Sequence, residues 1–349
     1  MTLDRVYLDN NSTVSLSNEC KEAMIKAMDL VGNPSSTHKE GRLSKEVIEQ
    51  ARDKIANAVN ADAANIVFTS GASEGAALLL RGNRIKCSKI EHPCVCSWCD
   101  TSLELSETGL VVVDDKSNST VQLANSETGI IQDVSGGLFM SDIVQGLGKV
   151  DFSFTESDLQ SALISAHKIG GPKGVGAVIT NSEIELEAQI LGGGQEKGQR
   201  SGTENVIAIA GFGAAMELAK KRLDDGEWQR VQELRDYLEA ELLNIAPNTT
   251  FIGKGLRRTP NTSYFSTRGW TGENQVIQMD LSGFAISAGS ACSSGKVSKS
   301  KVVREMGYGS HVADCAIRIS LSPENTKDEI ESFVKKWSEA YSNNKIAFA

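Results

Sequence analysis

Apolar residues recur with a helical period near the start of the chain. Met24, Ala27, Met28 and Val31 are spaced i, i+3, i+4 and i+7, and the same spacing is stronger over residues 43–59. Two amphipathic helices are therefore predicted, joined by the turn-rich segment GNPSSTHKEG. The next segment, NIVFTSGASEGAALLL, has the pattern of a buried strand, a turn of small residues and the start of a helix. It predicts one βα unit.

Short apolar runs dominate the middle of the chain. GLVVV, VQLA, GLFM, SALISA and VGAVIT are rich in apolar residues and bounded by turn residues, as expected of strands buried on both faces. They predict a mainly parallel sheet. From Asn205 to about Leu243 the pattern is helical again, and the tail supplies FAISAGS, AIRISLS and a helix near residues 327–342.

The chain length favours two lobes. A chain of 349 residues exceeds the roughly 250–300 residues at which single cores stop growing. We expect a large α/β domain over residues 13–230, and a small α+β domain built from residues 1–12 and 231–349. No apolar run approaches the roughly 20 residues of a membrane span, and the first residues lack the apolar core of a signal peptide. The expected location is the cytoplasm, without membrane contact.

Charge and cysteine content narrow the classes of function. A net charge of -9 argues against a nucleic-acid partner, because no Lys/Arg block supplies a basic face. Seven cysteines is an odd number, so reduced thiols are expected rather than a disulfide framework. Cys94, Cys96 and Cys99 have the spacing C-x-C-x-x-C without a fourth ligand close by. Buried or idle thiols are favoured there over a metal site.

Candidate chemistry is concentrated at three predicted strand ends. SALISAHKIGGPKGVGAVIT delivers Ser165, His167 and Lys168 to the end of a strand, where a desolvated lysine suits Schiff-base chemistry. An exposed turn lysine is the alternative. Asp142 in LFMSDIVQG is placed to pair with a pyridinium nitrogen. TSGASEG offers backbone N–H groups and the Ser73 hydroxyl as a phosphate seat, or only as a helix cap.

Nine segments in one order carry a family resemblance. They are YLDNNST, GNPSSTHKEGR, VFTSGASEG, EHPCV, NSETGIIQD, SAHKIGGPKGVGA, GGGQEKGQRSGTEN, SAGSACSSGKVS and AIRISLS. Together they resemble the pyridoxal 5'-phosphate-dependent cysteine desulfurases of the class V aminotransferases, in the housekeeping and nitrogen-fixation branch. The resemblance implies the fold of the fold-type I transferases, with a mainly parallel sheet of the seven-stranded type and a small α+β C-terminal domain.

The resemblance also implies roles for single residues. Lys168 matches the Schiff-base lysine and proton shuttle, Asp142 the partner of the pyridine nitrogen, and His92 the imidazole stacked on the ring. Gln145 matches a hydrogen bond to the ring hydroxyl, and Arg318 the guanidinium that grips the substrate carboxylate. The phosphate contacts would come from Gly71, Ala72, Ser73, Ser165 and His167, with Arg200 and Thr203 contributed by the neighbouring subunit of a homodimer.

The segment SAGSACSSGKVS provides the expected nucleophile, Cys292. The resemblance implies that L-cysteine becomes L-alanine while Cys292 takes the sulfur as a persulfide, for delivery to an acceptor protein of iron–sulfur cluster assembly or a thiolation pathway. Lys296, Lys299 and Lys301 would favour the thiolate, or are simply solvated loop lysines. The alternatives are a selenocysteine lyase or cysteine β-lyase on the same scaffold, and a non-catalytic scaffold protein.

Two departures from the family pattern are visible. Ser126 stands in ANSETG where the family has a second asparagine, so a shorter side chain is expected to contact cofactor and substrate. Only IIQDVSGG separates Gly129 from the strand that ends at Asp142, where relatives have an additional helix. We expect a sheet periphery that is trimmed at this point.

Overall fold

The computed structural model describes residues 5–289 and 300–348, so Cys292, Lys296 and Lys299 lie outside the described residues. Its helices are α1 (Asn18–Met28), α2 (Lys39–Val59), α3 (Ala72–Leu80), α4 (Pro93–Cys96), α5 (Val206–Asp224), α6 (Glu227–Ile245), α7 (Gly272–Leu281), α8 (Lys301–Glu305), α9 (Ser310–Cys315) and α10 (Lys327–Phe348). Its strands are β1 (Val6–Tyr7), β2 (Ile66–Thr69), β3 (Lys86–Ser88), β4 (Asp100–Leu103), β5 (Ser141–Asp142), β6 (Ser161–Ser165), β7 (Gly176–Thr180), β8 (Thr249–Phe251), β9 (Thr262–Thr267), β10 (Phe284–Ala285) and β11 (Ala316–Ser320).

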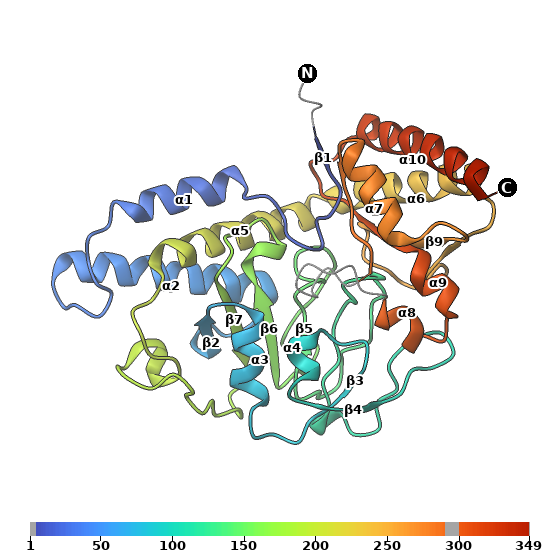
Figure 1. Ribbon diagram of the computed structural model, residues 1–349. Helices are drawn as coiled ribbons and strands as arrows, with labels where there is room; N and C mark the ends of the chain where they lie inside the picture. The colour runs from blue at the N-terminus through green and yellow to red at the C-terminus, as the bar shows by residue number, and fades with distance from the viewer. Residues whose placement is uncertain (1–4, 290–299, 349) are drawn as a thin grey trace.

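The central sheet is mixed. Its strand order is β2-β7-β6-β5, with β5 parallel to β6 and with β7 antiparallel to both of its neighbours (Figure 1). The prediction of an α/β fold with a parallel-containing sheet is confirmed, and the reversed β7 is a difference from the mainly parallel expectation. The chain between β6 and β7 is too short for the crossover of a dozen or more residues that a parallel pair needs. It can only reverse direction.

Parallel pairing extends the sheet beyond β5. Thr120 forms a parallel bridge with Met140, Ser119 forms one with Lys86 of β3, and β3 pairs in parallel with β4. The predicted strands VQLA and GLFM thus pair around these bridges, although the regular strand begins only at Ser141. GLVVV is not a strand among the described residues, and Val112 within it is 55% exposed.

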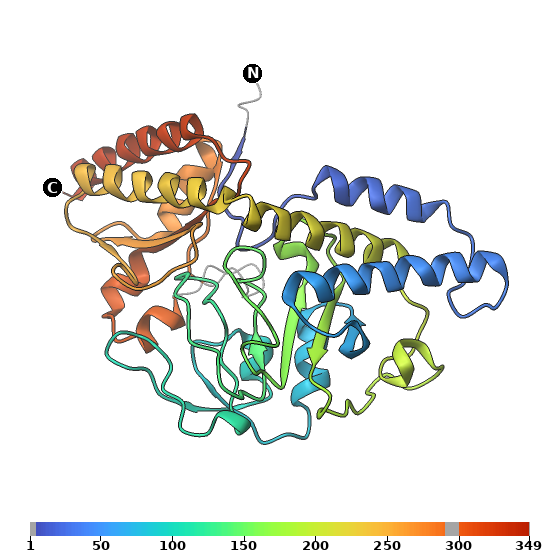
Figure 2. The same cartoon turned by 180° about the vertical axis from the view of Figure 1, so that it is seen from behind.

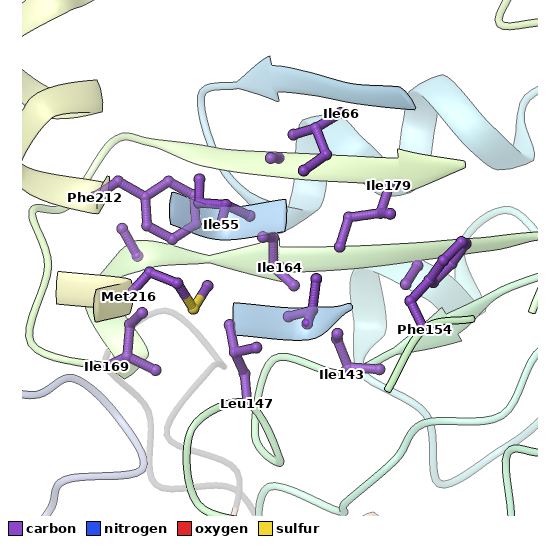
Figure 3. Packing of buried hydrophobic residues seen from close by; sticks show 14 of the residues in the cluster. Ile55, Ile66, Ile143, Leu147, Phe154, Ile164, Ile169, Ile179, Phe212 and Met216 are labelled. Carbon is purple, nitrogen blue, oxygen red and sulfur yellow. The ribbon is translucent and has the colours of Figure 1, made fainter. Parts of the chain in front are cut away.

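Alternating side chains on the strands bury both faces of the sheet. Ile164 and Ile179 pack with α2 and α5, where Ile55, Phe212 and Met216 complete the layer (Figure 3). The residues between them face the other way, so that Val67 of β2, Leu163 of β6 and Val178 of β7 pack against the leucines of α3. Figures 1 and 2 show the two helical layers from opposite sides, with α2 and α5 on one face and α3 on the other.

A second core lies in the C-terminal half. Helices α6, α7 and α10 pack on the antiparallel sheet β11-β9-β8, and Trp270, Phe333 and Trp337 lie at its centre. The N-terminal strand β1 joins this lobe by pairing with β10, and Asp9 bridges to Ser320. Helix α5 leads into α6 and connects the two lobes (Figure 2). In the described residues, no helix has both the length and the apolar character needed to cross a membrane.

The first helix differs from its prediction. Helix α1 ends at Met28 and packs on α5, and its buried residues are Ala27, which belongs to the predicted face, and Cys20, which does not. Met28 is 58% exposed and Val31, which follows the helix, is 88% exposed. The apolar spacing correctly indicated a helix there, but two of its four positions lie on the surface of the single chain.

Candidate active site

A cavity of about 590 Å³ opens where β5 and β6 end and α3 begins. Its walls come from both lobes, because Arg318 of β11 reaches it from the C-terminal sheet. Most of the predicted site residues line it, namely Gly71, Ala72, Ser73, His92, Ser126, Asp142, Gln145, Ser165, His167, Lys168 and Arg318. Ser12 and Arg318, which are 306 residues apart in the sequence, therefore meet at one site.

Lys168 lies on the single helical turn that follows β6. Its Nζ donates hydrogen bonds to the carbonyl oxygens of Asn11, at 2.6 Å, and of Ser12, at 2.9 Å. The N-terminal segment, which pairs with the C-terminal lobe, thus holds the amine at the cavity. Two backbone carbonyls thus orient the amine, which can reach a carbonyl group bound beside it.

Two buried carboxyl groups, those of Asp142 and Glu91, line the cavity and influence each other's charge. Asp142 is 8% exposed, its Oδ1 accepts the N–H of Val144 at 2.9 Å, and burial raises its pKa to about 6. Burial, followed by the nearby Asp142, raises the pKa of Glu91 well above its ordinary value. Oε1 of Glu91 accepts the N–H of Gln122 at 2.6 Å, whereas Oε2 has no donor among the described residues. Sequence reasoning missed Glu91, although it lies within EHPCV.

His92 begins the short helix α4, and its Nδ1 accepts the N–H of Cys94 at 3.2 Å. Burial, together with the charge of Lys168, lowers the pKa of His92 to about 4. The imidazole is therefore neutral at pH 7 and can lie against an aromatic ring without adding charge to the site. The Sγ of Cys94 is 2.9 Å from Nδ1, so the thiol also borders the cavity.

Gln145 is held from two sides. Its Nε2 donates to the carbonyl of Asn11 at 2.9 Å, and its Oε1 accepts from Nζ of Lys149 at 3.1 Å. Lys149 is only 4% exposed, and burial lowers its pKa to about 7, with further lowering by Lys168 and Arg318. Sequence reasoning missed this second buried lysine, which fixes the direction of the Gln145 amide.

An anion seat is formed where α3 approaches β7. Gly71 precedes the helix, whose first N–H groups have no intrahelical acceptor and favour a phosphate. A Cβ on Gly176 would lie 2.8 Å from Cα of Gly71, so only glycine permits this approach. Nearby, Nδ1 of His167 lies 3.3 Å from Oγ1 of Thr13. Acid, amine, imidazole and anion seat together fit pyridoxal 5'-phosphate.

Arg318 presents a partly satisfied guanidinium. Its Nη1 donates to the carbonyl of Ser126 at 2.9 Å, and its Nη2 donates to Asp9 at 2.6 Å and to the Ser12 hydroxyl at 2.8 Å. The buried Nε has no acceptor among the described residues. The side chain is thus oriented in advance and keeps a donor for an anionic group.

The chain does not bring every predicted residue to this cavity. Arg200 and Thr203 line a separate cavity of about 210 Å³. Nε of Arg200 donates to Oε1 of Glu74 at 2.9 Å in the same chain, and Glu74 itself lines the main cavity. The expected contribution to a neighbouring subunit stays a prediction. In the described part of the chain, no cluster of three or more His, Cys, Asp or Glu side chains could hold a metal ion.

Comparison with known proteins decides the family. The family model described as "Aminotransferase class-V" matches residues 6–333, which is nearly the whole chain. The chain belongs to the class-V aminotransferase family.

Curated relatives and solved structures agree with this membership. A "Cysteine desulfurase" of Cereibacter sphaeroides is 35% identical over 372 residues, covering 95% of this chain and 95% of that protein. A "Cysteine desulfurase IscS" of Dictyoglomus turgidum is 35% identical over 361 residues, covering 93% and 91%. The X-ray structure of a NifS-like protein from Rickettsia africae has a TM-score of 0.88 at 32% identity, covering 97% of this chain and 99% of that one.

Proposed function

We propose that this class-V aminotransferase is a cysteine desulfurase, which converts L-cysteine to L-alanine and transfers the sulfur to its own Cys292. One observation carries the proposal. Lys168, Asp142 and Arg318 converge on a single cavity, in a chain similar over nearly its whole length to proteins named cysteine desulfurases.

The cofactor proposed for the cavity is pyridoxal 5'-phosphate, which when bound supplies an electrophilic carbonyl and an electron sink. Nζ of Lys168 would hold that carbonyl, and the Asp142 carboxylate would hold a proton on the ring nitrogen. His92 would cover the ring as a neutral imidazole. Gly71, Ala72, Ser73, Ser165 and His167 would bind the phosphate, and Gln145, directed by Lys149, would face the ring hydroxyl.

Arg318 and Lys168 act on the substrate. The guanidinium would bind the carboxylate of cysteine through N–H donors that its described acceptors leave open. This grip fixes the Cα–H bond near Lys168, whose Nζ takes the proton from Cα once the amine is released. Ser126 would border the same substrate, with its carbonyl already steadying Arg318.

Cys292 would receive the sulfur. It lies outside the described residues, and the next described residue along the chain, Ser300, donates from its Oγ to Glu127 at 2.6 Å. Val302, two residues further on, lines the cavity. Ser300 and Val302, which follow Cys292 in the sequence, thus lie at the cavity.

The partners remain part of the same proposal. A homodimer would let Arg200 and Thr203 serve the phosphate of the opposite subunit. A sulfur-acceptor protein of iron–sulfur cluster assembly or a thiolation pathway would take the persulfide, in the cytoplasm, where thiols stay reduced.

The test is product analysis. The purified holoprotein, incubated with L-cysteine and a thiol reductant, is expected to form alanine and sulfide in equal amounts. Pyruvate and ammonia in place of alanine would indicate a β-lyase, and a protein without either activity would contradict the proposal. Selenocysteine is offered as an alternative substrate to the protein with and without Cys292. A selenocysteine lyase would keep its activity without Cys292.

A further inference from the structure

A buried carboxyl group without a step in the proposed reaction lies in the wall of the cavity. Glu127 belongs to the segment ANSETG, and it lines the cavity although only 4% of its surface is exposed. Its Oε2 accepts hydrogen bonds from two hydroxyl groups, that of Ser300 at 2.6 Å and that of Tyr264 at 3.2 Å. Both donors are fully buried. The carboxyl group therefore joins three segments of the chain inside the protein.

A second contact fixes the direction of the Ser300 hydroxyl. Ser300 is the N-cap of α8, and its Oγ accepts the N–H of Val303 at 3.1 Å. The hydroxyl proton is left for another acceptor, which is Glu127. Val302, in the first turn of the same helix, lines the cavity. Glu127 thus holds the start of a helix that borders the cavity.

Two neighbouring side chains of the C-terminal sheet reach the same segment. Tyr264 lies opposite Arg318 in the antiparallel pair of β9 and β11, and residues opposite each other place their side chains on one face. Tyr264 donates to Glu127, while Nη1 of Arg318 donates to the carbonyl of the preceding residue, Ser126, at 2.9 Å. The sheet therefore holds two consecutive residues of ANSETG, one through Arg318 and one through Tyr264.

The segment between these contacts is a tight turn. Oδ1 of Asn125 accepts the N–H groups of Glu127 and Thr128, at 3.0 Å and 2.9 Å, and the carbonyl of Asn125 accepts the N–H of Gly129 at 2.9 Å. Asn125 is itself buried. A shift of the Glu127 side chain is therefore expected to move the adjacent Ser126 carbonyl, because the turn is bonded internally on both sides of it.

The surroundings of Glu127 favour its charged form. Burial raises the pKa of Glu127, and the Ser300 hydroxyl, the charge of Arg318 and the Tyr264 hydroxyl act against this rise. Removing either hydroxyl leaves a buried acceptor with one donor fewer, so the carboxyl group and its turn have to move to find another.

We propose that Glu127 is a positioning residue for substrate binding: held by Tyr264 and Ser300, it fixes the ANSETG turn so that the Ser126 carbonyl directs Arg318 towards the substrate carboxylate. The inference rests on the proposed desulfurase function and adds to it, because the contacts of Glu127 belong to no step of the reaction. Its loss is expected to weaken substrate binding more than it slows the later steps.

The test measures alanine formation from L-cysteine by full-length holoprotein carrying Ser300→Ala or Tyr264→Phe. Each variant removes one donor to Glu127 and leaves the carboxyl group in place. We expect each to raise KM about 3–10-fold, the size of effects passed on through intermediate residues, with a smaller change in kcat. Cofactor absorbance shows that each variant is loaded, and the two variants test the same acceptor independently.

Matched controls remove hydroxyls of the same lobe that do not line the cavity. Ser322→Ala loses a hydrogen bond to Asn325 of 3.3 Å, and Tyr237→Phe loses one to Glu331 of 3.4 Å. Both controls are expected to keep the wild-type KM. A rise in KM for the controls that equals the rise for Ser300→Ala and Tyr264→Phe would overturn the proposal.

Double variants with Arg318→Lys show whether the effect passes through Arg318. If Glu127 acts by directing Arg318, Ser300→Ala should add little to the KM of Arg318→Lys, whereas independent effects would multiply. Independent effects, or an unchanged KM in both single variants, would overturn this inference alone. A wild-type holoprotein that forms no alanine from L-cysteine would overturn the proposed function, and this inference with it.

Discussion

Arg318 shows how single contacts prepare a residue for its ligand. Asp9, Ser12 and the carbonyl of Ser126 orient its two terminal nitrogens, and these three acceptors leave N–H donors of the guanidinium for a carboxylate. A lysine at this position keeps the charge but loses the planar set of donors. We expect Arg318→Lys to raise KM for cysteine about 10–100-fold with a smaller change in kcat, since a hydrogen bond to a charged group contributes about 1.5–3 kcal/mol.

Steady-state kinetics with purified holoenzyme measure this effect. Arg304→Lys is a matched control, because Arg304 belongs to the same lobe but pairs with Asp314 at the surface, at 3.2 Å. An unchanged KM for Arg318→Lys, or an equal change for the control, would remove Arg318 from substrate binding.

Lys149 carries a prediction about pH. Its pKa is about 7 in the folded protein and near 10.5 when unfolded, so between these values the unfolded chain binds the proton more strongly. Its contribution to the free energy of unfolding therefore rises from pH 7 to pH 10, by at most about 1.4 kcal/mol per pH unit. Urea titrations of cofactor-free wild type and Lys149→Met should diverge in this window, with the variant showing the flatter profile. Parallel profiles would contradict the depressed pKa.

Site residues could be predicted from the sequence where a reactive side chain directly follows a predicted strand. Lys168 and Asp142 were found because each follows a buried apolar run, and both line one cavity in the structure. Glu91 and Lys149 were not, since their burial depends on segments that meet only in the folded chain. For Glu91, the available signal was a charged residue within the family segment EHPCV.

At the scale of elements, the length of a connection determines the relative direction of two strands, which their apolar runs do not reveal. SALISA and VGAVIT were correctly predicted as strands, yet their relative direction depends on the short glycine-rich link between them. Helix α1 illustrates a second limit. Its apolar spacing fits a helix, but of the two residues that α1 buries, Ala27 belongs to that spacing and Cys20 does not.

The packing of α3 on β7 gives a prediction at this scale. A Cβ on Gly176 would lie 2.6 Å from the carbonyl oxygen of Ile164 and 2.8 Å from Cα of Gly71. Gly176→Ala is expected to displace the anion seat, lower the stability by about 1–3 kcal/mol and weaken cofactor binding. Gly194→Ala, whose Cβ would meet no atom within 4 Å, is the control. The loss of cofactor absorbance during dialysis measures the weakened binding. Equal retention of the cofactor by both variants would contradict the role of Gly176 in the anion seat.

At the scale of the whole molecule, the site depends on two cores meeting. The N-terminal segment pairs with the C-terminal lobe and also holds Lys168, so neither half of the chain completes the cavity alone. Family order along the sequence made this arrangement predictable. Cys292 and any second subunit lie outside the described residues, so the roles proposed for them stay predictions.

A shared site between subunits predicts complementation. If Arg200 serves the opposite subunit, mixed dimers of Lys168→Ala and Arg200→Ala contain one intact site each. Co-expression with two different tags, followed by double purification, should recover up to half of the wild-type activity per dimer, while each parent variant stays low. Light scattering gives the dimer mass. No recovery in verified mixed dimers would assign Arg200 to its own chain, where it already contacts Glu74.

The central claim is that Lys168 and Cys292 act in one reaction at different steps. The most direct measurement is alanine formed per chain after one exposure of holoprotein to cysteine without reductant, in wild type, Lys168→Ala and Cys292→Ser. Wild type should form about one alanine per chain, with a persulfide on Cys292. Lys168→Ala should form none, and Cys292→Ser should keep the cofactor and bind cysteine yet lose alanine formation by roughly 100-fold or more. Alanine formed by Cys292→Ser at the wild-type rate would contradict the account.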